Sequence, residues 1–273
     1  MGRVAKPGTP DHESASIPVG KLGTLDLEAH LRDPARRQAF VTPMFDVIAP
    51  RYDAFTRLFS FGMDAGWKRA AIVAAVGKTS APRAPRDVLD LAAGTGDLAI
   101  GIARALPDAS VSALDASVGM IEAANCRLAA RDADVASRVR PMIGDMSALA
   151  FPDASMDVVS AGYGVRNVPD ATRAIREMRR VLRRGGRLVL LDFYRPDNAL
   201  WRTLFLSYLQ VAGNAVGWWW HRDPVVYGYI GRSIEHFVSW QQCSALLADS
   251  GFQVVRVTRH LGGGVAMHEA IAV

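Results

Sequence analysis

Strand, glycine-rich turn and helix meet in one segment of this chain, Asp90-Leu91-Ala92-Ala93-Gly94-Thr95-Gly96-Asp97. The segment follows an apolar run that begins at Val88 and precedes a helical pattern over residues 98–106. Glycines in such a turn let the backbone approach a ligand closely, and the N-terminus of the helix offers unpaired N–H groups. The segment therefore predicts a cofactor site at the end of the first strand of a sheet.

The residues of this segment leave two cofactors open. Read with Ala99, the segment satisfies the relaxed dinucleotide pattern G-x-G-x-x-G/A, and Asp115 lies about 20 residues farther on, where a ribose-binding acid belongs. Both NAD and S-adenosylmethionine contain such a ribose. Helices before the first strand, a hairpin at the end of the sheet and Asp90 at the end of strand one favour the methyltransferase version of the fold. An NAD-dependent oxidoreductase and a turn without a ligand are the competing interpretations.

Strand and helix patterns alternate along the chain after this segment. Apolar runs predict strands at residues 110–115, 139–143, 156–163 and 187–193, and periodic segments predict helices at 118–132 and 171–182. Gly185-Gly186 is a stop signal for the second of these helices. Two last strand-like runs, joined by Gly262-Gly263-Gly264, predict a terminal hairpin. The predicted fold class is α/β, a doubly wound, Rossmann-like sheet of seven strands with the last strand antiparallel.

The segments outside this alternation predict a cap and an insertion. Residues 1–38 are rich in Gly, Pro, Ser and charge and predict a mobile arm, whereas residues 39–273 predict one domain. Within that domain, residues 39–78 predict a helical cap that is broken near Ser60-Phe61-Gly62, followed by a linker at 79–86. Residues 196–238 predict a helical insertion that covers the acceptor, and a further helix is expected around residues 240–249.

Charge and cysteine content narrow the class of protein. The chain has a net charge of +5, with 50% hydrophobic and 22% charged residues, as is typical of a folded globular protein. Its pI of about 9.5 arises without a block of Lys and Arg, so we expect no nucleic-acid partner. The 2 cysteines form no CxxC pair and the 6 histidines form no cluster with ligand spacing, so we expect neither a disulfide scaffold nor a metal site. No secretory signal follows Met1, and we expect a cytoplasmic protein.

Two acidic residues stand where successive predicted strands end. Asp115 ends the second strand, where a carboxylate can accept both hydroxyl hydrogens of a ribose. A cap for the helix that begins near Ser117 is the alternative role. Asp145 follows the third strand and is expected to accept a hydrogen bond from the amino group of an adenine, with simple termination of the strand as its alternative.

The segment after the fourth strand gives the most specific signal, Gly162-Tyr163-Gly164-Val165-Arg166-Asn167-Val168-Pro169-Asp170. With the glycine-rich turn and an N-terminal signature, it resembles the ubiquinone/menaquinone biosynthesis C-methyltransferase family of the UbiE/MenG type. The N-terminal signature consists of Tyr52-Asp53, Ser60-Phe61-Gly62 and Trp67-Lys68. The resemblance continues through Tyr227, Tyr229, Ser233-Ile234, Phe237 and residues 263–268.

The chain departs from the family pattern at several positions. Thr56 stands where the family usually has Asn, Asp64 where it usually has His, and Ile230 where it usually has Leu. The cluster Trp218-Trp219-Trp220 is not a family feature, and residues 269–273 are less basic than is usual. Most of these departures fall in segments expected to cover the acceptor.

The resemblance implies S-adenosylmethionine as the cofactor and a lipophilic acceptor, a prenylated benzoquinol or naphthoquinol, in ubiquinone or menaquinone biosynthesis. The residues it implies for the cofactor are Asp90, Gly94, Thr95, Gly96, Asp115, Ala116, Met120, Asp145, Met146 and Gly162. The catalytic residues it implies are Arg166, Asn167 and Asp145. The residues it implies for the acceptor are Tyr52, Tyr163, Tyr229 and His268.

Methylation of a ring carbon requires an electron-rich ring and then the loss of a proton from the same carbon. Arg166 is a poor base because a guanidinium stays protonated, so we expect it to stabilise phenolate charge and to position water. Asn167 is expected to orient a water or hydroxyl, and Asp145 to complete the relay. A turn in which Arg166 pairs with Asp170 is the alternative. Methylation of another small aromatic or secondary-metabolite acceptor, and a noncatalytic binding module, are the alternative functions.

The predicted helix at residues 198–220 carries an apolar stripe that ends in tryptophans and Arg222. Three roles stay open for it: a lid over the active site, a homodimer interface, and a peripheral contact with the inner face of the membrane. Its polar residues Arg202, Gln210 and Asn214 argue against a membrane-spanning helix.

Overall fold

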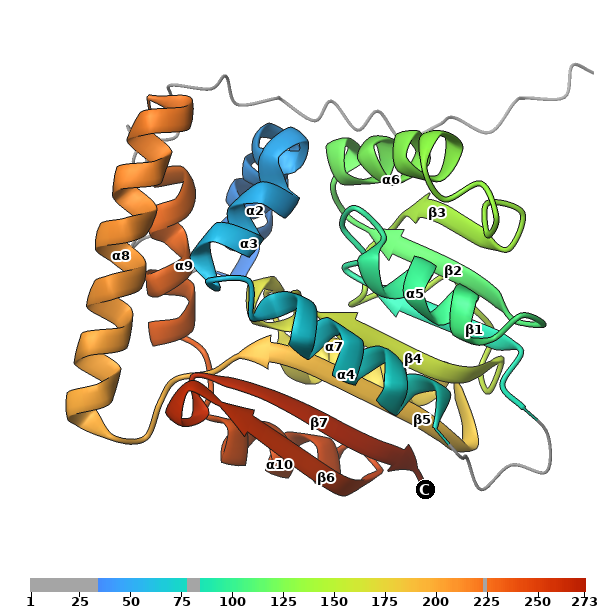
Figure 1. Cartoon of the computed structure of the whole chain (residues 1–273). Coiled ribbons are helices and arrows are strands. Elements are labelled where there is room, and N and C mark those ends of the chain that lie inside the picture. Colours follow the sequence, from blue (N-terminus) through green and yellow to red (C-terminus); the bar gives the residue numbers. More distant parts are fainter. Residues whose placement is uncertain (1–33, 78–83, 223–224) are drawn as a thin grey trace, which may run out of the picture.

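The computed structural model describes residues 34–77, 84–222 and 225–273. Residues 1–33 of the predicted arm lie outside the described residues, as does most of the linker predicted at 79–86. The boundary predicted at residue 38 is wrong, because residues 34–38 already belong to the first helix of the cap. The described residues form one sheet with helices on both of its faces (Figure 1).

Seven strands form the sheet, in the order β3-β2-β1-β4-β5-β7-β6. They are β1 (Asp87–Leu91), β2 (Ser110–Asp115), β3 (Val139–Ile143), β4 (Met156–Gly162), β5 (Leu182–Phe193), β6 (Phe252–His260) and β7 (Val265–Ala272). Strands β1 to β5 pair in parallel, and β7 runs antiparallel to both of its neighbours. The predicted doubly wound sheet of seven strands, with the last antiparallel, is confirmed.

Helices cover both faces of the sheet because its central strands are apolar on both sides. Leu89 and Leu91 of β1 pack into the cluster under α7 (Ala171–Val181) and α10 (Trp240–Asp249). Val88 points the other way, into the cluster under α4 (Asp64–Val76), α5 (Asp97–Ala105) and α6 (Val118–Ala130). This burial on both faces explains why the strand sequences are continuous apolar runs rather than alternating ones.

The prediction that Gly185-Gly186 end the helix α7 is wrong. The helix ends at Val181, and Leu182 already has extended backbone angles and a buried side chain, so it begins β5. Gly185, with φ of 77°, and Gly186 lie inside β5, where its register against β4 shifts. The two glycines therefore mark an irregularity in a strand, because burial of Leu182 ends the helix before they are reached.

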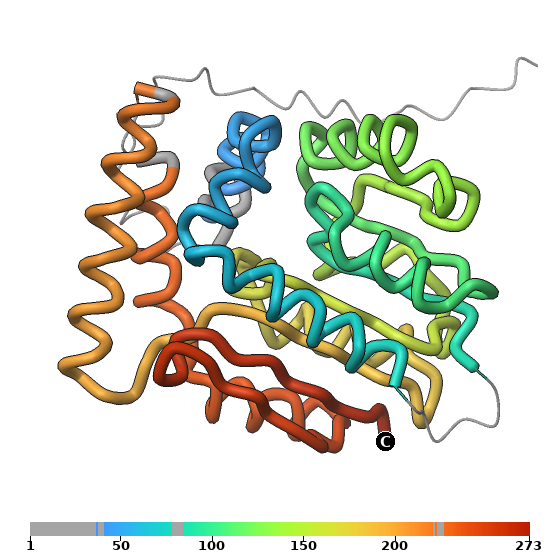
Figure 2. Tube along the Cα trace, viewed as in Figure 1, coloured from blue at the N-terminus to red at the C-terminus, as the bar shows by residue number. Residues whose placement is uncertain are grey.

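Short helices form the predicted cap, and the break near Ser60-Phe61-Gly62 is confirmed. The cap consists of α2 (Pro34–Ile48), a 3-10 turn η2 (Ala49–Arg51), α3 (Tyr52–Phe59) and α4. Phe61 and Gly62 have φ of 50° and 78°, which reverses the chain between α3 and α4. Figure 2 shows the cap (blue) between the orange helix pair α8 and α9 and the green helix α6.

The insertion before the last strands contains two long helices, α8 (Ala199–His221) and α9 (Val225–Glu235), where the sequence pattern predicted one. They pack closely, because a Cβ added at Gly213 would lie 2.7 Å from the carbonyl oxygen of Tyr227. Among the described helices, α8 included, none is both long and apolar enough to cross a membrane.

Candidate active site

Two cavities lie at the edge of the sheet where the parallel strands end. The strand order reverses there between β1 and β4, which is where doubly wound sheets hold their ligands. The large cavity encloses about 350 Å³ between the cap helices, α8, α9 and the segment after β4. The small cavity encloses about 70 Å³ between the ends of β1 to β4 and the helices α2, α3 and α6.

The glycine-rich turn after β1 has a backbone that favours glycine. Gly94 and Gly96 have φ of 54° and 88°, and Gly96 is the N-cap of α5. A Cβ added at Gly94 would lie 3.9 Å from both Met120 Sδ and Tyr52 Cε1, so a larger side chain would enter the small cavity. The turn thus leaves its backbone open to a ligand beneath the cap.

Asp90 holds this turn from below. Its Oδ2 accepts a hydrogen bond from Ala99 N at 3.0 Å, and its Oδ1 accepts one from Ser160 Oγ at 2.7 Å. Burial raises the pKa of Asp90 to about 7, although both hydrogen bonds act to lower it. Because these two hydrogen bonds join the start of α5 and strand β4 to Asp90, we propose that Asp90 fixes the turn.

Asp115 ends β2 and faces the small cavity. Its Oδ2 accepts a hydrogen bond from Gly94 N at 2.8 Å and its Oδ1 accepts one from Ser117 N at 2.9 Å. Burial raises the pKa of this carboxyl group. A carboxylate has about four acceptor positions, so hydroxyl donors can still be received. The side chain that caps α6 is Ser117, which accepts from Met120 N at 3.1 Å.

The structure places most of the predicted cofactor residues around the small cavity. Those that line it are Gly94, Asp115, Ala116, Met120, Asp145, Met146 and Gly162. Asp90 and Thr95 line an adjoining pocket of about 30 Å³, together with Lys68. Gly96 lies at the start of α5 instead, where it turns the chain.

A buried ion pair fixes the segment after β4. Arg166 Nη1 donates to Asp192 Oδ1 at 2.8 Å and to Tyr163 O at 2.5 Å, while its backbone N–H donates to Asp192 Oδ2 at 3.1 Å. Burial alone would lower the pKa of Arg166, but the charge of Asp192 outweighs it and raises the pKa, so the guanidinium keeps its charge. The alternative pairing of Arg166 with Asp170 is wrong, since Asp170 accepts from Arg173 N and caps α7.

Asn167 and Asp145 lie on the small-cavity side. The Asn167 Oδ1 atom accepts a hydrogen bond from the hydroxyl of Tyr229 at 2.9 Å. The Asp145 carboxylate accepts from Ser147 N at 2.7 Å and lines only the small cavity among the described pockets. Both groups line the same cavity, and a relay between them through a water or hydroxyl stays a prediction.

The large cavity is mainly apolar. Tyr52 and Tyr163 line both cavities and so form the wall between them, and Arg166 and Tyr229 line the large cavity. Within the described structure, two buried polar atoms have no hydrogen-bond partner here, the Tyr163 hydroxyl and Arg166 Nε. Tyr163 also has φ of 61°, which is unusual for a tyrosine. Unpaired buried donors and backbone strain at one point are typical of a ligand site.

Among the described residues, Asp64 is the one acidic residue that lines the large cavity. It lies at the start of α4 with 7% of its surface exposed. Its Oδ1 accepts from Ser60 Oγ at 2.9 Å, and its Oδ2 lies 3.3 Å from Lys68 Nζ. Sequence reasoning noted Asp64 as a departure from the family pattern but gave it no role.

His268 is not where the resemblance implied. It lies in β7, fully buried beneath α10, where its Nε2 lies 3.0 Å from both Trp240 O and Ser244 Oγ, and its Nδ1 lies 3.3 Å from the Tyr194 hydroxyl. Burial lowers its pKa to about 4. It lines neither cavity, because its side chain points to the face of the sheet that α7 and α10 cover. The expectation that His268 contributes to the acceptor site is therefore wrong.

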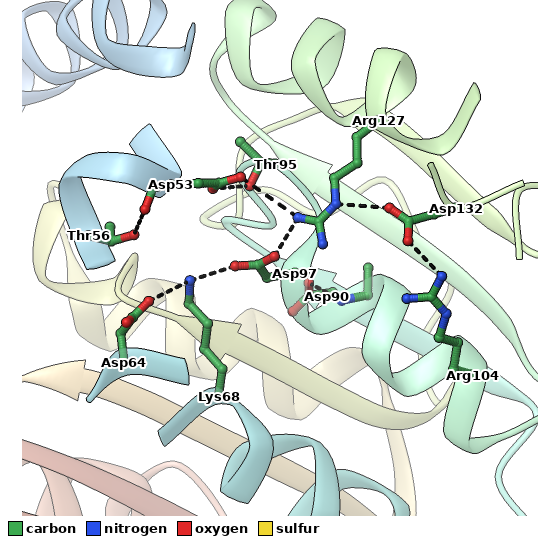
Figure 3. Close-up of polar contacts among 11 residues, drawn as sticks. Asp53, Thr56, Asp64, Lys68, Asp90, Thr95, Asp97, Arg104, Arg127 and Asp132 are labelled. Carbon is green, nitrogen blue, oxygen red and sulfur yellow. Dashed lines mark hydrogen bonds and ion pairs between the residues drawn. The ribbon is translucent and has the colours of Figure 1, made fainter. Parts of the chain in front are cut away.

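Charged side chains tie the cap to the glycine-rich turn (Figure 3). Asp97, the first residue of α5, accepts from Lys68 Nζ of α4 at 2.6 Å and also pairs with Arg127 of α6. Thr95 Oγ1 donates to Asp53 Oδ1 of α3 at 2.7 Å. Burial would raise the pKa of Asp97, but Lys68 and Arg127 outweigh burial and lower it. The cap is thus held electrostatically against the loop that it covers.

Comparisons with known proteins agree with one another. The profile described as the ubiE/COQ5 methyltransferase family matches residues 33–272. A demethylmenaquinone methyltransferase from Thermus thermophilus is 37% identical over 211 residues, which cover 77% of this chain and 92% of that protein. A ubiquinone/menaquinone biosynthesis C-methyltransferase UbiE from Geotalea daltonii is 34% identical over 215 residues, covering 78% and 88%. A SAM-dependent methyltransferase from Thermotoga maritima has a TM-score of 0.59 at 17% identity, covering 85% of this chain and 99% of that one.

The raised pKa of Asp90 predicts a pH-dependent difference between two proteins. A carboxyl group with a pKa of 3.8 when unfolded and about 7 when folded contributes stability that is complete below the unfolded pKa and is lost as the pH rises through the folded one. Asp90→Asn keeps the uncharged form at every pH. Its free energy of unfolding relative to wild type should therefore increase by about 1–4 kcal/mol between about pH 4 and about pH 8.

Thermal and urea unfolding across this pH range measure the difference. The exposed Asp108 gives a matched control, and Asp108→Asn should show no such trend. A difference between Asp90→Asn and wild type that does not change with pH would contradict the account of Asp90.

Proposed function

Because the chain belongs to the ubiE/COQ5 methyltransferase family, we propose that it methylates a ring carbon of a prenylated benzoquinol or naphthoquinol in ubiquinone or menaquinone biosynthesis. One observation carries the proposal beyond the family: a large apolar cavity has a buried, charged Arg166 at the wall it shares with Tyr163. An apolar cavity suits a prenylated ring, and a fixed cation suits a ring oxygen that becomes negative. The names of the Thermus and Geotalea relatives support the same acceptor class.

Family membership also decides between the two cofactors. The chain is an S-adenosylmethionine-dependent methyltransferase with the Rossmann-like fold that was predicted. The NAD interpretation of the glycine pattern is wrong, because that pattern describes a turn that both cofactor classes share.

The residues around the small cavity fit this cofactor. Gly94 has no side chain where a Cβ would point at Met120 and Tyr52, and the Asp115 carboxylate has acceptor positions left for a ribose diol. Asp145 lines the same cavity and can accept from an adenine amino group. When bound, S-adenosylmethionine supplies a methyl group on a positively charged sulfur.

Arg166 activates the acceptor in this proposal. A quinol ring carbon becomes nucleophilic when the neighbouring phenolic oxygen carries negative charge. Arg166 Nε and the Tyr163 hydroxyl are buried donors without a protein partner, in two residues that line the large cavity, and in this proposal they donate to that oxygen. Asp192 holds the guanidinium in place before the acceptor arrives, and preorganised donors of this kind stabilise developing charge without reorganising.

Asp64 accepts the proton that the ring carbon loses after methylation. Its carboxylate lines the large cavity, and the hydroxyl of Ser60 orients it. We assign this role to Asp64 rather than Asp145, because Asp145 lines only the small cavity among the described pockets.

The acceptor class also indicates where the enzyme works. A prenylated quinol partitions into lipid, so we propose that the protein collects its acceptor by peripheral contact with the inner face of the membrane.

Product analysis tests the proposed function. The purified protein, given S-adenosylmethionine and a chemically reduced prenylated naphthoquinol or benzoquinol, should yield a product heavier by one methyl group, with the new methyl on a ring carbon by NMR. The same quinol without its prenyl chain should react less well, because it leaves the apolar cavity unfilled. Methylation at oxygen, or turnover only with an unrelated small aromatic acceptor, would overturn the proposal.

Arg166→Lys should lower turnover about 100-fold or more, because it removes a fixed donor from the ring oxygen while keeping a positive charge beside Asp192. Affinity for S-adenosylhomocysteine, measured by calorimetry, should stay close to wild type, since Arg166 does not line the small cavity. Arg187→Lys is the matched control, because Arg187 is equally buried and pairs with Glu269 far from both cavities. If Arg166→Lys and Arg187→Lys lost turnover equally, the loss would come from replacing any buried arginine by lysine, and the role of Arg166 would be contradicted.

Asp64→Asn should lower turnover about 100-fold or more while the enzyme still binds S-adenosylhomocysteine, because the amide keeps the hydrogen bond with Ser60 but cannot accept a proton. Single-turnover kinetics with a quinol deuterated at the reacting carbon measure the step directly. The wild type is expected to release the deuteron quickly and the variant slowly. Unchanged turnover in Asp64→Asn would assign the proton to another group.

A further inference from the structure

The outward face of α8 is apolar over nearly its whole length. Six side chains spaced along one face of the helix have exposed fractions between 38% and 72%, and we call them the α8 stripe: Leu200, Leu204, Tyr208, Val211, Trp218 and Trp219. Side chains three, four or seven residues apart share one face of a helix, and this face extends for about 28 Å. Single exposed apolar residues are ordinary, but a continuous row of this length marks an interaction surface.

The opposite face of α8 is already occupied. Phe205, Leu209 and Gly213 are buried there, and the close approach at Gly213 leaves no room for a Cβ between α8 and α9. Figure 1 shows α8 as the outermost helix on the left, with α9 between it and the cap. The stripe therefore cannot turn inward without separating the two helices.

The mouth of the large cavity opens through this surface. Leu204 and Tyr208 belong to the α8 stripe and also line the large cavity. Phe61 lines it as well, is 75% exposed, and stacks on Tyr208 with the ring centroids 5.9 Å apart. Because the same side chains contact solvent and cavity, they form the rim of its entrance.

The charged residues of the helix itself are positive, although Asp197 precedes the helix and Asp223 follows it in the sequence. Residues 198–222 contain Arg202 and Arg222 but no acidic residue. The Arg222 guanidinium lies 4.8 Å from the centre of the Trp218 ring, and that of Arg51 lies 5.8 Å from the centre of the Trp220 ring. Tryptophans with neighbouring arginines are typical of surfaces that lie at the headgroups of an anionic bilayer.

We propose that the α8 stripe docks on the surface of an anionic lipid bilayer, with α8 parallel to the membrane plane and the large cavity open toward the lipid. This docking surface rests on the proposed function in one respect, because it takes the acceptor to be lipophilic. A second copy of the chain seated on the stripe would cover the rim at Leu204 and Tyr208, whereas a bilayer delivers a lipid-soluble acceptor through it. The stripe supplies apolar contact, and the arginines complement anionic headgroups.

Co-sedimentation with lipid vesicles tests the docking surface. The full chain should pellet with vesicles of phosphatidylglycerol and phosphatidylcholine in about equal parts, and less well with phosphatidylcholine alone. The combined variant Leu200→Glu and Val211→Glu should lower binding at least about tenfold, because it places two carboxylates against the anionic surface. Neither residue lines the large cavity.

The matched control is the combined variant Val73→Glu and Val255→Glu, which makes the same change of charge on α4 and β6 at side chains that are 68% and 52% exposed. It should bind vesicles like the wild type. Equal binding of the two variants, or no binding of the wild type, would overturn the proposal. So would a dimer in sedimentation velocity that the stripe variant disperses while vesicle binding is absent, which would assign the stripe to a second copy.

Activity separates this proposal from the proposed function. The stripe variant should methylate a detergent-dispersed quinol with a short prenyl chain at the wild-type rate, and should be slower only when the quinol is embedded in vesicles. Stripe-dependent vesicle binding by a protein that methylates no quinol would support the docking surface and overturn the proposed function.

Discussion

A buried ion pair joins the ends of two neighbouring parallel strands, and the site is organised around it. Arg166 follows β4 and Asp192 lies in β5, and both side chains are almost completely removed from solvent. Leaving either charge there without the other would be strongly unfavourable, so the pair constrains the segment that follows β4. The guanidinium that results belongs to a residue that lines the large cavity, and its buried Nε has no hydrogen-bond partner among the described residues.

The two cavities take their separate characters from what covers them. Ends of parallel strands converge at one edge of the sheet and carry carboxylates, so the small cavity is polar at its floor. The large cavity lies under α3, α4, α8 and α9, whose apolar faces meet above the same edge. The ion pair from Lys68 to Asp97 and the hydrogen bond from Thr95 to Asp53 hold the cap against the glycine-rich turn. The two cavities are thus adjacent but separated by Tyr52 and Tyr163.

The sequence predicted best those elements whose position depends on local periodicity. The strands at 110–115 and 139–143, helix α10 and the break in the cap lie where periodicity placed them. Features that depend on contacts distant in the chain were missed or wrong. Asp192 is a single acid at the end of an apolar run, and nothing local shows that it meets Arg166. His268 was misplaced because the alternation along β7 does not by itself show which face of the sheet borders the cavities.

A crystal structure of the enzyme with S-adenosylhomocysteine and a prenylated quinol analogue tests the central claim most directly. We expect the nucleoside in the small cavity with its ribose on Asp115, and the quinol ring in the large cavity. One ring oxygen should lie within hydrogen-bonding distance of Arg166 Nε and the Tyr163 hydroxyl, with the prenyl chain leading toward Leu204 and Tyr208. A quinol bound outside the large cavity, or a ring that leaves both donors unpaired, would contradict the account.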